Sequence, residues 1–213
     1  GAPCRPALTA WRSTAPPDLF EQFINGELNT RQDRYGGSIE NRLHLLLETI
    51  DALGAAIGGR HVGVRISPFG RLYDMHPFAD EKQTWLALAA ELGRRELAYV
   101  HLSDQRTPGA DCETVFFADF RLAYPGTLIV AGGFNQTSAE AALQSAKADL
   151  IGFGTPFVAN PDLVERMQHH WPLAQVQRDT LYGLHGAHGY TDYPRYAEQA
   201  SSHRTTEALE PSC

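Results

Sequence analysis

The sequence predicts an α/β protein built from parallel βαβ units, and the alternation of its segments is the main reason. Short runs that are apolar throughout alternate along the chain with longer segments of helical periodicity. Such runs are typical of strands buried on both faces of a parallel sheet. We expect four strands, at His61–Ser67, Leu97–Ser103, Thr127–Gly133 and Asp149–Gly154.

The helices are predicted from apolar periodicity and from residues that cap helix ends. Ser38 can cap a helix whose apolar side ends at Gly58-Gly59. Further helices are expected over Glu81–Leu92 and Glu113–Leu122, from a Thr137 cap through Ala146, and from Pro161 onward. Each predicted strand is therefore followed by a predicted helix.

The two ends of the chain lack this pattern. Residues 1–17 are rich in Pro, Ala, Ser and Thr without a period, which predicts an irregular or disordered lead-in. Residues 18–196 are expected to form one partial α/β domain. After Trp171 we expect irregular structure and a short terminal helix, with residues 197–213 as a disordered tail.

Composition excludes several classes of protein. The chain has 213 residues and a net charge of −7 without a basic stripe, which argues against nucleic acid as a partner. No apolar run approaches the ~18 residues of a membrane span. The three cysteines, Cys4, Cys112 and Cys213, form no CxxC pair, which argues against disulfides and zinc and favours the cytoplasm. No metal site is expected.

Four βα units are compatible with two kinds of parallel sheet. A doubly wound sheet can be made of them. However, glycine-rich turns follow the third and fourth predicted strands, and a (β/α)8 (TIM) barrel holds phosphate with the loops after its strands seven and eight. We therefore expect strands five to eight of a TIM barrel, which makes the fold a partial barrel.

Five motifs in register then identify a family. They are "NTRQDRYGGSIENR" (29–42), "VGVRISPFG" (62–70), "AGGF" (131–134), "GFGTPFVANPDLVER" (152–166) and "LYG…GAHGYTDYP" (181–194). In this order they resemble the C-terminal half of the old yellow enzymes, which are FMN-dependent ene-reductases that include the 12-oxophytodienoate reductases. The resemblance runs from about Leu19 to about Tyr196. It implies a TIM barrel, FMN, NAD(P)H as hydride donor, and reduction of the C=C bond of α,β-unsaturated carbonyl compounds.

Two side chains match the family's flavin and substrate contacts. The resemblance places Arg65 by the pyrimidine edge of the flavin, where a fixed positive charge stabilises the anionic reduced ring. Without that match, Arg65 would be read as a strand-end arginine paired with a carboxylate. Tyr182 matches a tyrosine over the flavin, near the substrate carbonyl, although an aromatic residue filling a loop is an equal alternative.

Three glycines match the family's phosphate-binding turns. Gly132, Gly133 and Gly154 can let backbone amides approach a phosphate, because glycine has no Cβ; the alternative is glycine needed only for chain reversal. Thr155 departs from the family, which usually has arginine there. A hydroxyl can donate one hydrogen bond but brings no charge, so we expect weaker phosphate binding.

The family's pair of carbonyl-binding residues is missing from its expected place. Ser13 and Pro16 stand at those positions, and Asp18 stands where the proton-donating tyrosine would be. The junction near Pro17 suggests a truncation, an altered splice or a shifted reading frame. "HGAHGY" offers His185 and His188 as a displaced pair, but a similar string occurs outside catalysis in the family's C-terminal tail.

Two functional interpretations therefore remain. The first is an FMN-dependent oxidoreductase related to ene-reductases, acting on an enone-type small molecule, with doubtful activity in this chain. The second is a catalytically inactive partial barrel that forms a homo-oligomer or pairs with a complementary half. A flavodoxin-like module is a weaker third alternative, because no phosphate loop follows the first strand. The sequence does not decide between NADH and NADPH.

Overall fold

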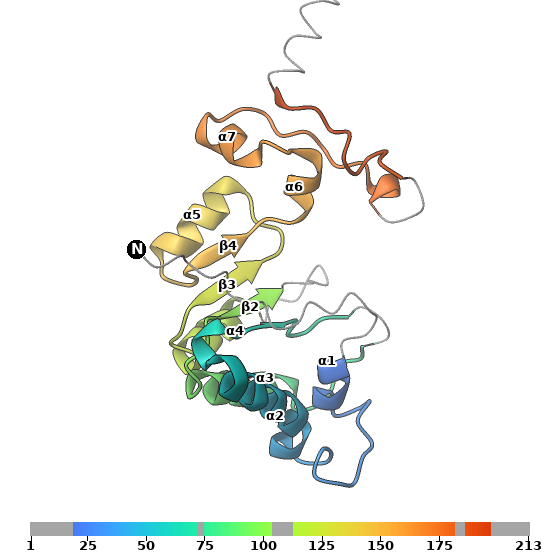
Figure 1. Cartoon of the computed structure of the whole chain (residues 1–213), viewed down its shortest axis with the longest axis vertical. Coiled ribbons are helices and arrows are strands. Elements are labelled where there is room, and N and C mark those ends of the chain that lie inside the picture. The colour runs from blue at the N-terminus through green and yellow to red at the C-terminus, as the bar shows by residue number, and fades with distance from the viewer. Residues whose placement is uncertain (1–18, 72–74, 104–112, 182–185, 197–213) are drawn as a thin grey trace, which may run out of the picture. The chain divides into compact units, whose positions relative to one another are not determined.

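The computed structural model describes residues 19–71, 75–103, 113–181 and 186–196 (Figure 1). The chain divides into two compact units, Gly1–Gly152 and Phe153–Cys213, which are described separately. No helix among the described residues is long and apolar enough to cross a membrane. The predicted lead-in, the predicted tail and the terminal helix lie outside these residues.

The first unit is a parallel sheet whose strands alternate with helices along the chain. Its elements in chain order are α1 (Leu19–Ile24), α2 (Ile39–Ile57), the 3-10 turn η1 (Gly59–His61), β1 (Gly63–Ile66), α3 (Glu81–Gly93), β2 (Tyr99–Ser103), α4 (Glu113–Ala123), β3 (Leu128–Ala131), α5 (Gln136–Gln144) and β4 (Leu150–Gly152). The four strands are all parallel and lie in the order β1-β2-β3-β4. A doubly wound sheet reverses its strand order at a switch point, and these strands do not, as expected of a segment of a barrel.

The register of the strands separates two faces of the sheet. Arg65 pairs with His101, His101 with Ile129, and Ile129 with Leu150. Residues paired in a parallel ladder point to the same side, so these four side chains share one face, which we call the Arg65 face. It is the less buried side of the sheet, with Arg65 exposed and Leu150 54% exposed.

The opposite face of the sheet carries the core. Val64, Val100 and Leu128 are at most 4% exposed there, and α2, α3 and α4 cover them with apolar side chains. The largest side chains in this core are Trp85 of α3, Phe116 and Phe120 of α4, and Tyr124 directly after α4. Burial of these apolar side chains determines which face of the sheet packs against the helices. The Arg65 face is thereby left for other contacts.

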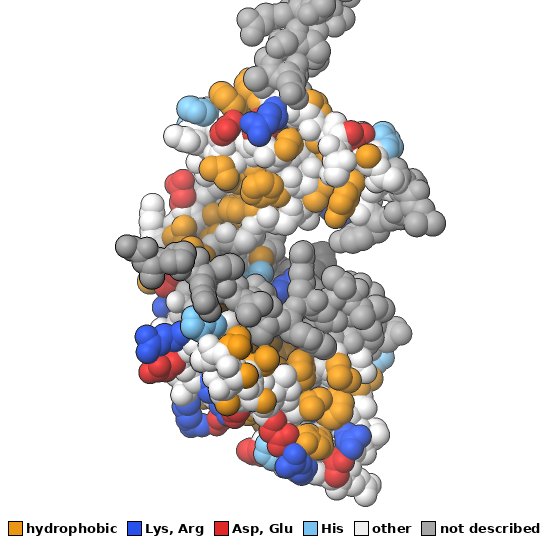
Figure 2. Space-filling view, viewed as in Figure 1, with side chains coloured by type: hydrophobic (Ala, Val, Ile, Leu, Met, Phe, Trp, Pro, Cys, Tyr) orange, Lys and Arg blue, Asp and Glu red, His pale blue; other side chains and the backbone are white. Residues whose placement is uncertain are grey.

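The surface carries both signs of charge. Figure 2 shows basic and acidic side chains lying beside one another on the visible face. Arg95, for example, pairs with Asp51 at 2.6 Å and with Glu91 at 3.0 Å. Exposed ion pairs of this kind contribute little to stability. Because acidic side chains lie beside the basic ones, the face in view carries no continuous basic stripe.

Two helix starts show where capping was predicted well and where it was not. Ser38 caps α2 as predicted, because its Oγ accepts a hydrogen bond from the Asn41 N–H at 3.3 Å. The predicted Thr137 cap is wrong. Asn135 is the N-cap of α5, since its Oδ1 accepts from the Ser138 N–H at 2.9 Å while the Ser138 hydroxyl accepts from the Asn135 N–H. This reciprocal capping box starts the helix at Gln136.

The second unit contains short helices joined by side-chain hydrogen bonds. Its elements are α6 (Thr155–Ala159), α7 (Leu163–Gln168) and the 3-10 turn η2 (Arg178–Thr180). The helix predicted from Pro161 begins two residues later, because Pro161 and Asp162 form the turn before it. Asn160 is fully buried and ties this turn to the chain beyond α7, donating to the Ala174 carbonyl and accepting from the Ala174 N–H.

Candidate cofactor-binding site

Arg65 is an exposed cation at the carboxyl-terminal end of β1. It is the third of the four residues of the strand, and its alternating place directs it away from the buried Val64 and Ile66. Its Nη2 donates to the Ser103 Oγ at 2.6 Å. Among the described residues no carboxylate pairs with it, so the predicted alternative of a carboxylate-paired arginine has no support there. A charge held by a neutral hydroxyl remains able to bind an electron-rich ligand.

His101 lies beside Arg65 on β2, and its Nε2 is buried without a hydrogen-bond partner among the described residues. Burial, and then the nearby Arg65 charge, lower the pKa of this imidazole from 6.5 to about 4, so the ring is neutral at physiological pH. Buried polar atoms normally have a hydrogen-bond partner, so a buried nitrogen without one indicates that its partner is not among the described residues.

The turn after β3 requires glycine. Gly132 has φ 130° and Gly133 has φ 63°. Residues with a side chain rarely adopt the first of these angles, and the second is costly for most of them. A Cβ on Gly133 would meet nothing within 4 Å, so its backbone is accessible from the side where a Cβ would project. The glycine turn therefore exposes backbone, as a phosphate-binding turn must.

Gly154 and Thr155 belong to the second unit, where they start α6. Both residues are exposed, and a Cβ on Gly154 would meet nothing within 4 Å. Gly154 has φ −97° and ψ −77°, which other residues can adopt, so the described surroundings do not require glycine there. Whether this pair meets the Gly132-Gly133 turn, as the sequence predicts, stays a prediction.

The predicted carbonyl-binding candidates are only partly described. Tyr182, His185, Ser13, Pro16 and Asp18 lie outside the described residues. His188 is exposed, and its Nδ1 lies 3.1 Å from the Asp192 Oδ2. The other oxygen of this carboxylate accepts a hydrogen bond from the Gly189 N–H. These contacts give His188 a local structural role, and its catalytic role stays a prediction. Among the described positions no three His, Cys, Asp or Glu residues gather as a metal site.

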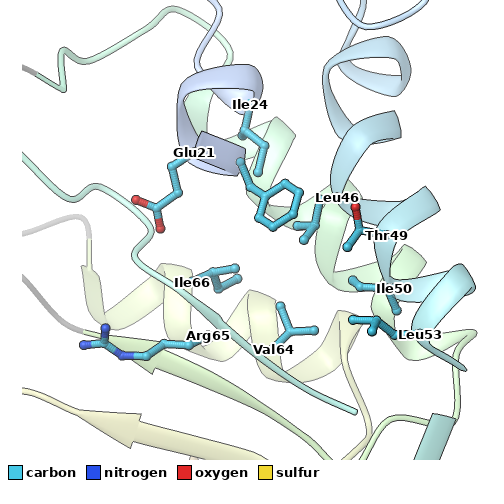
Figure 3. Close-up of a pocket in the computed structure, with 10 residues that line it drawn as sticks. Glu21, Ile24, Leu46, Thr49, Ile50, Leu53, Val64, Arg65 and Ile66 are labelled. Atoms are coloured by element: carbon cyan, nitrogen blue, oxygen red, sulfur yellow. The ribbon is translucent and has the colours of Figure 1, made fainter. Parts of the chain in front are cut away.

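A pocket lies at the outer edge of β1, and Arg65 is among the residues that line it. It lies between α1, α2 and β1, and the side chains of Ile24, Ile50 and Val64 give it an apolar lining (Figure 3). In this view Val64 and Ile66 point toward the helices, whereas the guanidinium of Arg65 points away from them. Glu21 is the acidic residue of the lining, and its Oε1 accepts from the Ser67 N–H at 2.7 Å. The sequence did not indicate this pocket, because α1 has only six residues and shows no period.

The residues of the first unit fit a flavin nucleotide. Arg65 supplies a cation at the end of β1 that has no acidic partner in the described part of the chain, and the Gly132-Gly133 turn supplies accessible backbone at the end of β3. His101, on the strand between them, supplies a polar atom that has no hydrogen-bond partner within the described residues. A cation for an electron-rich ring and a glycine turn for a phosphate are the groups that such a ligand needs.

Comparison with known proteins gives a consistent family. The NADH:flavin oxidoreductase / NADH oxidase family matches residues 17–174. A putative 12-oxophytodienoate reductase 11 of Oryza sativa subsp. japonica is 36% identical over 179 residues, which cover 83% of this chain and 48% of the relative. The 12-oxophytodienoate reductase 2 of Arabidopsis thaliana is also 36% identical, with the same coverage.

Solved structures agree with this assignment. Morphinone reductase superposes with a TM-score of 0.77 at 38% identity, over 85% of this chain and 48% of that protein. An old yellow enzyme homologue from Zymomonas mobilis has a TM-score of 0.74 at 32% identity, over 83% of this chain and 50% of its own. The chain thus spans about half the length of the relatives it matches, as the predicted partial TIM barrel requires. The chain belongs to the NADH:flavin oxidoreductase / NADH oxidase family, within the old yellow enzymes that its motifs resemble.

Proposed function

We propose that this chain is the flavin-binding part of an ene-reductase, which passes hydride from NAD(P)H through FMN to the C=C bond of an α,β-unsaturated carbonyl compound. One observation carries the proposal. Arg65 presents a charge at the end of β1 that no acidic side chain of the described ranges neutralises, and the glycine turn at the end of β3 lies on the same sheet. One of the structural relatives is morphinone reductase in complex with tetrahydroNAD, which supports a nicotinamide donor.

Each residue would have a definite task. Arg65 would hold the flavin ring and favour negative charge on it, with Ser103 fixing the guanidinium. The turn of Gly132 and Gly133 would bind the phosphate through backbone N–H groups, and Gly154 with Thr155 would complete that site. Tyr182 would contact the substrate. The cofactor, when bound, supplies the two-electron chemistry of hydride transfer.

Activity of this chain by itself is expected to be low. Ser13, Pro16 and Asp18 cannot provide the two carbonyl-polarising donors and the tyrosine acid that the family resemblance calls for. The test is to purify the 213-residue chain, record its visible spectrum after incubation with FMN, and assay NADPH oxidation with 2-cyclohexenone. We expect a flavin band with little turnover. Robust turnover would show that another pair, such as His185 and His188, polarises the carbonyl, and no flavin band would contradict the proposal.

A second function is favoured by the edges of the sheet. Among the described strands β1 and β4 each pair on one side only, and Leu150 on β4 is 54% exposed. Unpaired parallel edges favour association with another chain. The alternative is therefore an inactive partial barrel that self-associates or pairs with a complementary half. Sedimentation velocity over a hundredfold range of concentration checks it: concentration-dependent oligomers without a flavin band would favour this alternative.

A further inference from the structure

His101 is a polar residue of the Arg65 face to which the family resemblance assigns no role. Its Nε2 is buried and has no hydrogen-bond partner among the described residues. A Cβ placed on Gly152 would lie 3.7 Å from this nitrogen and 3.1 Å from the Cβ of Ala131. Because Gly152 has no side chain, the space beside Nε2 is not filled from β4.

The order of the strands places His101 between the two ends of the proposed ligand. Arg65 is on β1 and the Gly132-Gly133 turn follows β3, and β2 runs between these strands. A molecule that reaches from Arg65 to the glycine turn must therefore cross β2. If the ring lies at Arg65 and the phosphate at the turn, the part of FMN that crosses β2 is the ribityl chain, which carries hydroxyl groups.

Tyr99, His101 and Ser103 are the side chains of β2 on the Arg65 face. Ser103 already has a partner, because its Oγ accepts from Arg65 at 2.6 Å, and its hydroxyl keeps one hydrogen to donate. Leu102 points to the opposite, buried face. His101 differs from the other two in having a buried polar atom, Nε2, without a hydrogen-bond partner among the described residues. An uncharged imidazole can exchange a hydrogen bond with a hydroxyl group in either direction, according to its tautomer.

We propose that His101 is a ligand-binding residue of the flavin site, whose Nε2 hydrogen bonds a hydroxyl group of the ribityl chain. The inference rests on the proposed function, because it needs the ring at Arg65 and the phosphate at the glycine turn. It gives the partnerless nitrogen a partner and adds a contact that riboflavin shares with FMN. A ligand without the polyol cannot make this contact.

A pair of amide variants gives the sharpest test. In His101→Gln the terminal amide group occupies the place of Nε2, whereas in His101→Asn the amide ends near Nδ1 and falls short of it. His101→Leu removes both nitrogens and serves as the apolar reference. Fluorescence-quenching titrations of FMN and of riboflavin, with circular dichroism as the control for folding, compare the three variants with the unmodified chain.

We expect His101→Asn and His101→Leu to weaken FMN and riboflavin equally, by about three- to tenfold, which is the value of one neutral hydrogen bond. His101→Gln should bind both within about twofold of the unmodified chain. The visible band of the bound flavin should not move, because the contact is with the polyol and not with the ring.

The outcomes separate this inference from the function on which it rests. If the unmodified chain binds neither flavin, the proposed function and the inference both fail. If it binds FMN and all three variants bind equally well, or Gln is as weak as Asn, only the role of His101 is overturned. A shifted flavin band in His101→Leu would place the contact on the ring and would also overturn it.

Discussion

Arg166 and Asp162, one turn apart at the start of α7, form a buried ion pair in the second unit. The Arg166 Nε donates to the Asp162 Oδ1 at 2.6 Å, and the two side chains are 1% and 2% exposed. The guanidinium also donates to the carbonyls of Pro172 and Pro194, and Asp162 accepts from the Tyr196 N–H at 2.8 Å. Burial opposes ionisation of Asp162, but these hydrogen bonds hold its pKa below the usual value. One pair thus fixes two distant parts of the chain to α7.

The first prediction removes the cation of this pair. Arg166→Leu leaves the Asp162 carboxylate buried without its partner and two carbonyls without a donor, which should cost about 3–5 kcal/mol of stability. Hydrogen exchange of the Tyr196 amide measures the local effect. We expect its protection to fall by at least two orders of magnitude, since each 1.4 kcal/mol corresponds to a factor of ten. In Arg166→Lys, which keeps the charge but lacks the forked guanidinium, the protection of the Tyr196 amide should lie between those of Arg166→Leu and the unmodified chain. Unchanged protection in Arg166→Leu would show that the pair is dispensable.

The second prediction concerns the titration of His101. Its pKa of about 4 in the folded chain lies below the ordinary 6.5, so between these values the unfolded chain binds more protons. This contribution to stability is complete above pH 6.5 and is lost as the pH falls toward 4. An NMR titration of the imidazole protons should show no midpoint near 6.5. Arg65→Gln should raise the pKa only in part, because burial is the larger cause, and an ordinary midpoint in the unmodified chain would refute the described environment.

The third prediction compares two neighbouring glycines. Gly132→Ala puts a side chain at φ 130°, which should cost about 1–3 kcal/mol and displace the turn after β3. Gly133→Ala, at φ 63°, should cost only roughly 1 kcal/mol and serves as the matched control. FMN titrations and thermal melts measure both effects. We expect FMN to lose more affinity than riboflavin in Gly132→Ala, and equal losses would mean that the turn does not hold the phosphate.

The fourth prediction restores a charge at the start of α6. If Thr155 faces the phosphate, Thr155→Arg supplies a charged hydrogen bond and should tighten FMN by roughly tenfold or more. Riboflavin has no phosphate and should gain nothing. Arg65→Ala should weaken both ligands, because its partner is the ring. A folded Thr155→Arg variant with unchanged FMN affinity would show that this part of the second unit does not contribute to phosphate binding.

Much of the fold was predictable, because period and capping are local properties of the sequence. The four strands and the long helices were found where apolar runs and helical periodicity placed them. The boundaries were predicted less well. The second strand begins at Tyr99 and not at Leu97, because the Ala98 N–H donates to the Val62 carbonyl just before the paired part of the strand begins. The short helices α1 and α6 have too few residues to show a period, and helices of this length depend on tertiary packing more than on propensity.

The candidate site was predictable to the extent that single residues carry its chemistry. Arg65 and the glycines after β3 stood out because they lie in motifs that resemble those of the family. His101 did not, because the state of its Nε2 depends on the register of β2 with β1 and on the absence of a side chain at Gly152. Such properties arise only when strands far apart in sequence are brought together.

The sequential order of the strands has a consequence for how the first unit acquires its structure. Each strand pairs only with the strands before and after it in the chain, so every ladder closes a loop of similar, modest length. Chains with such local topology can grow by adding one βα unit at a time. The last strand to join this series is β4, which has three residues and one described neighbour. Amides of β2 should therefore exchange with solvent most slowly and those of β4 most quickly, so that this sheet frays from its carboxyl-terminal edge inward.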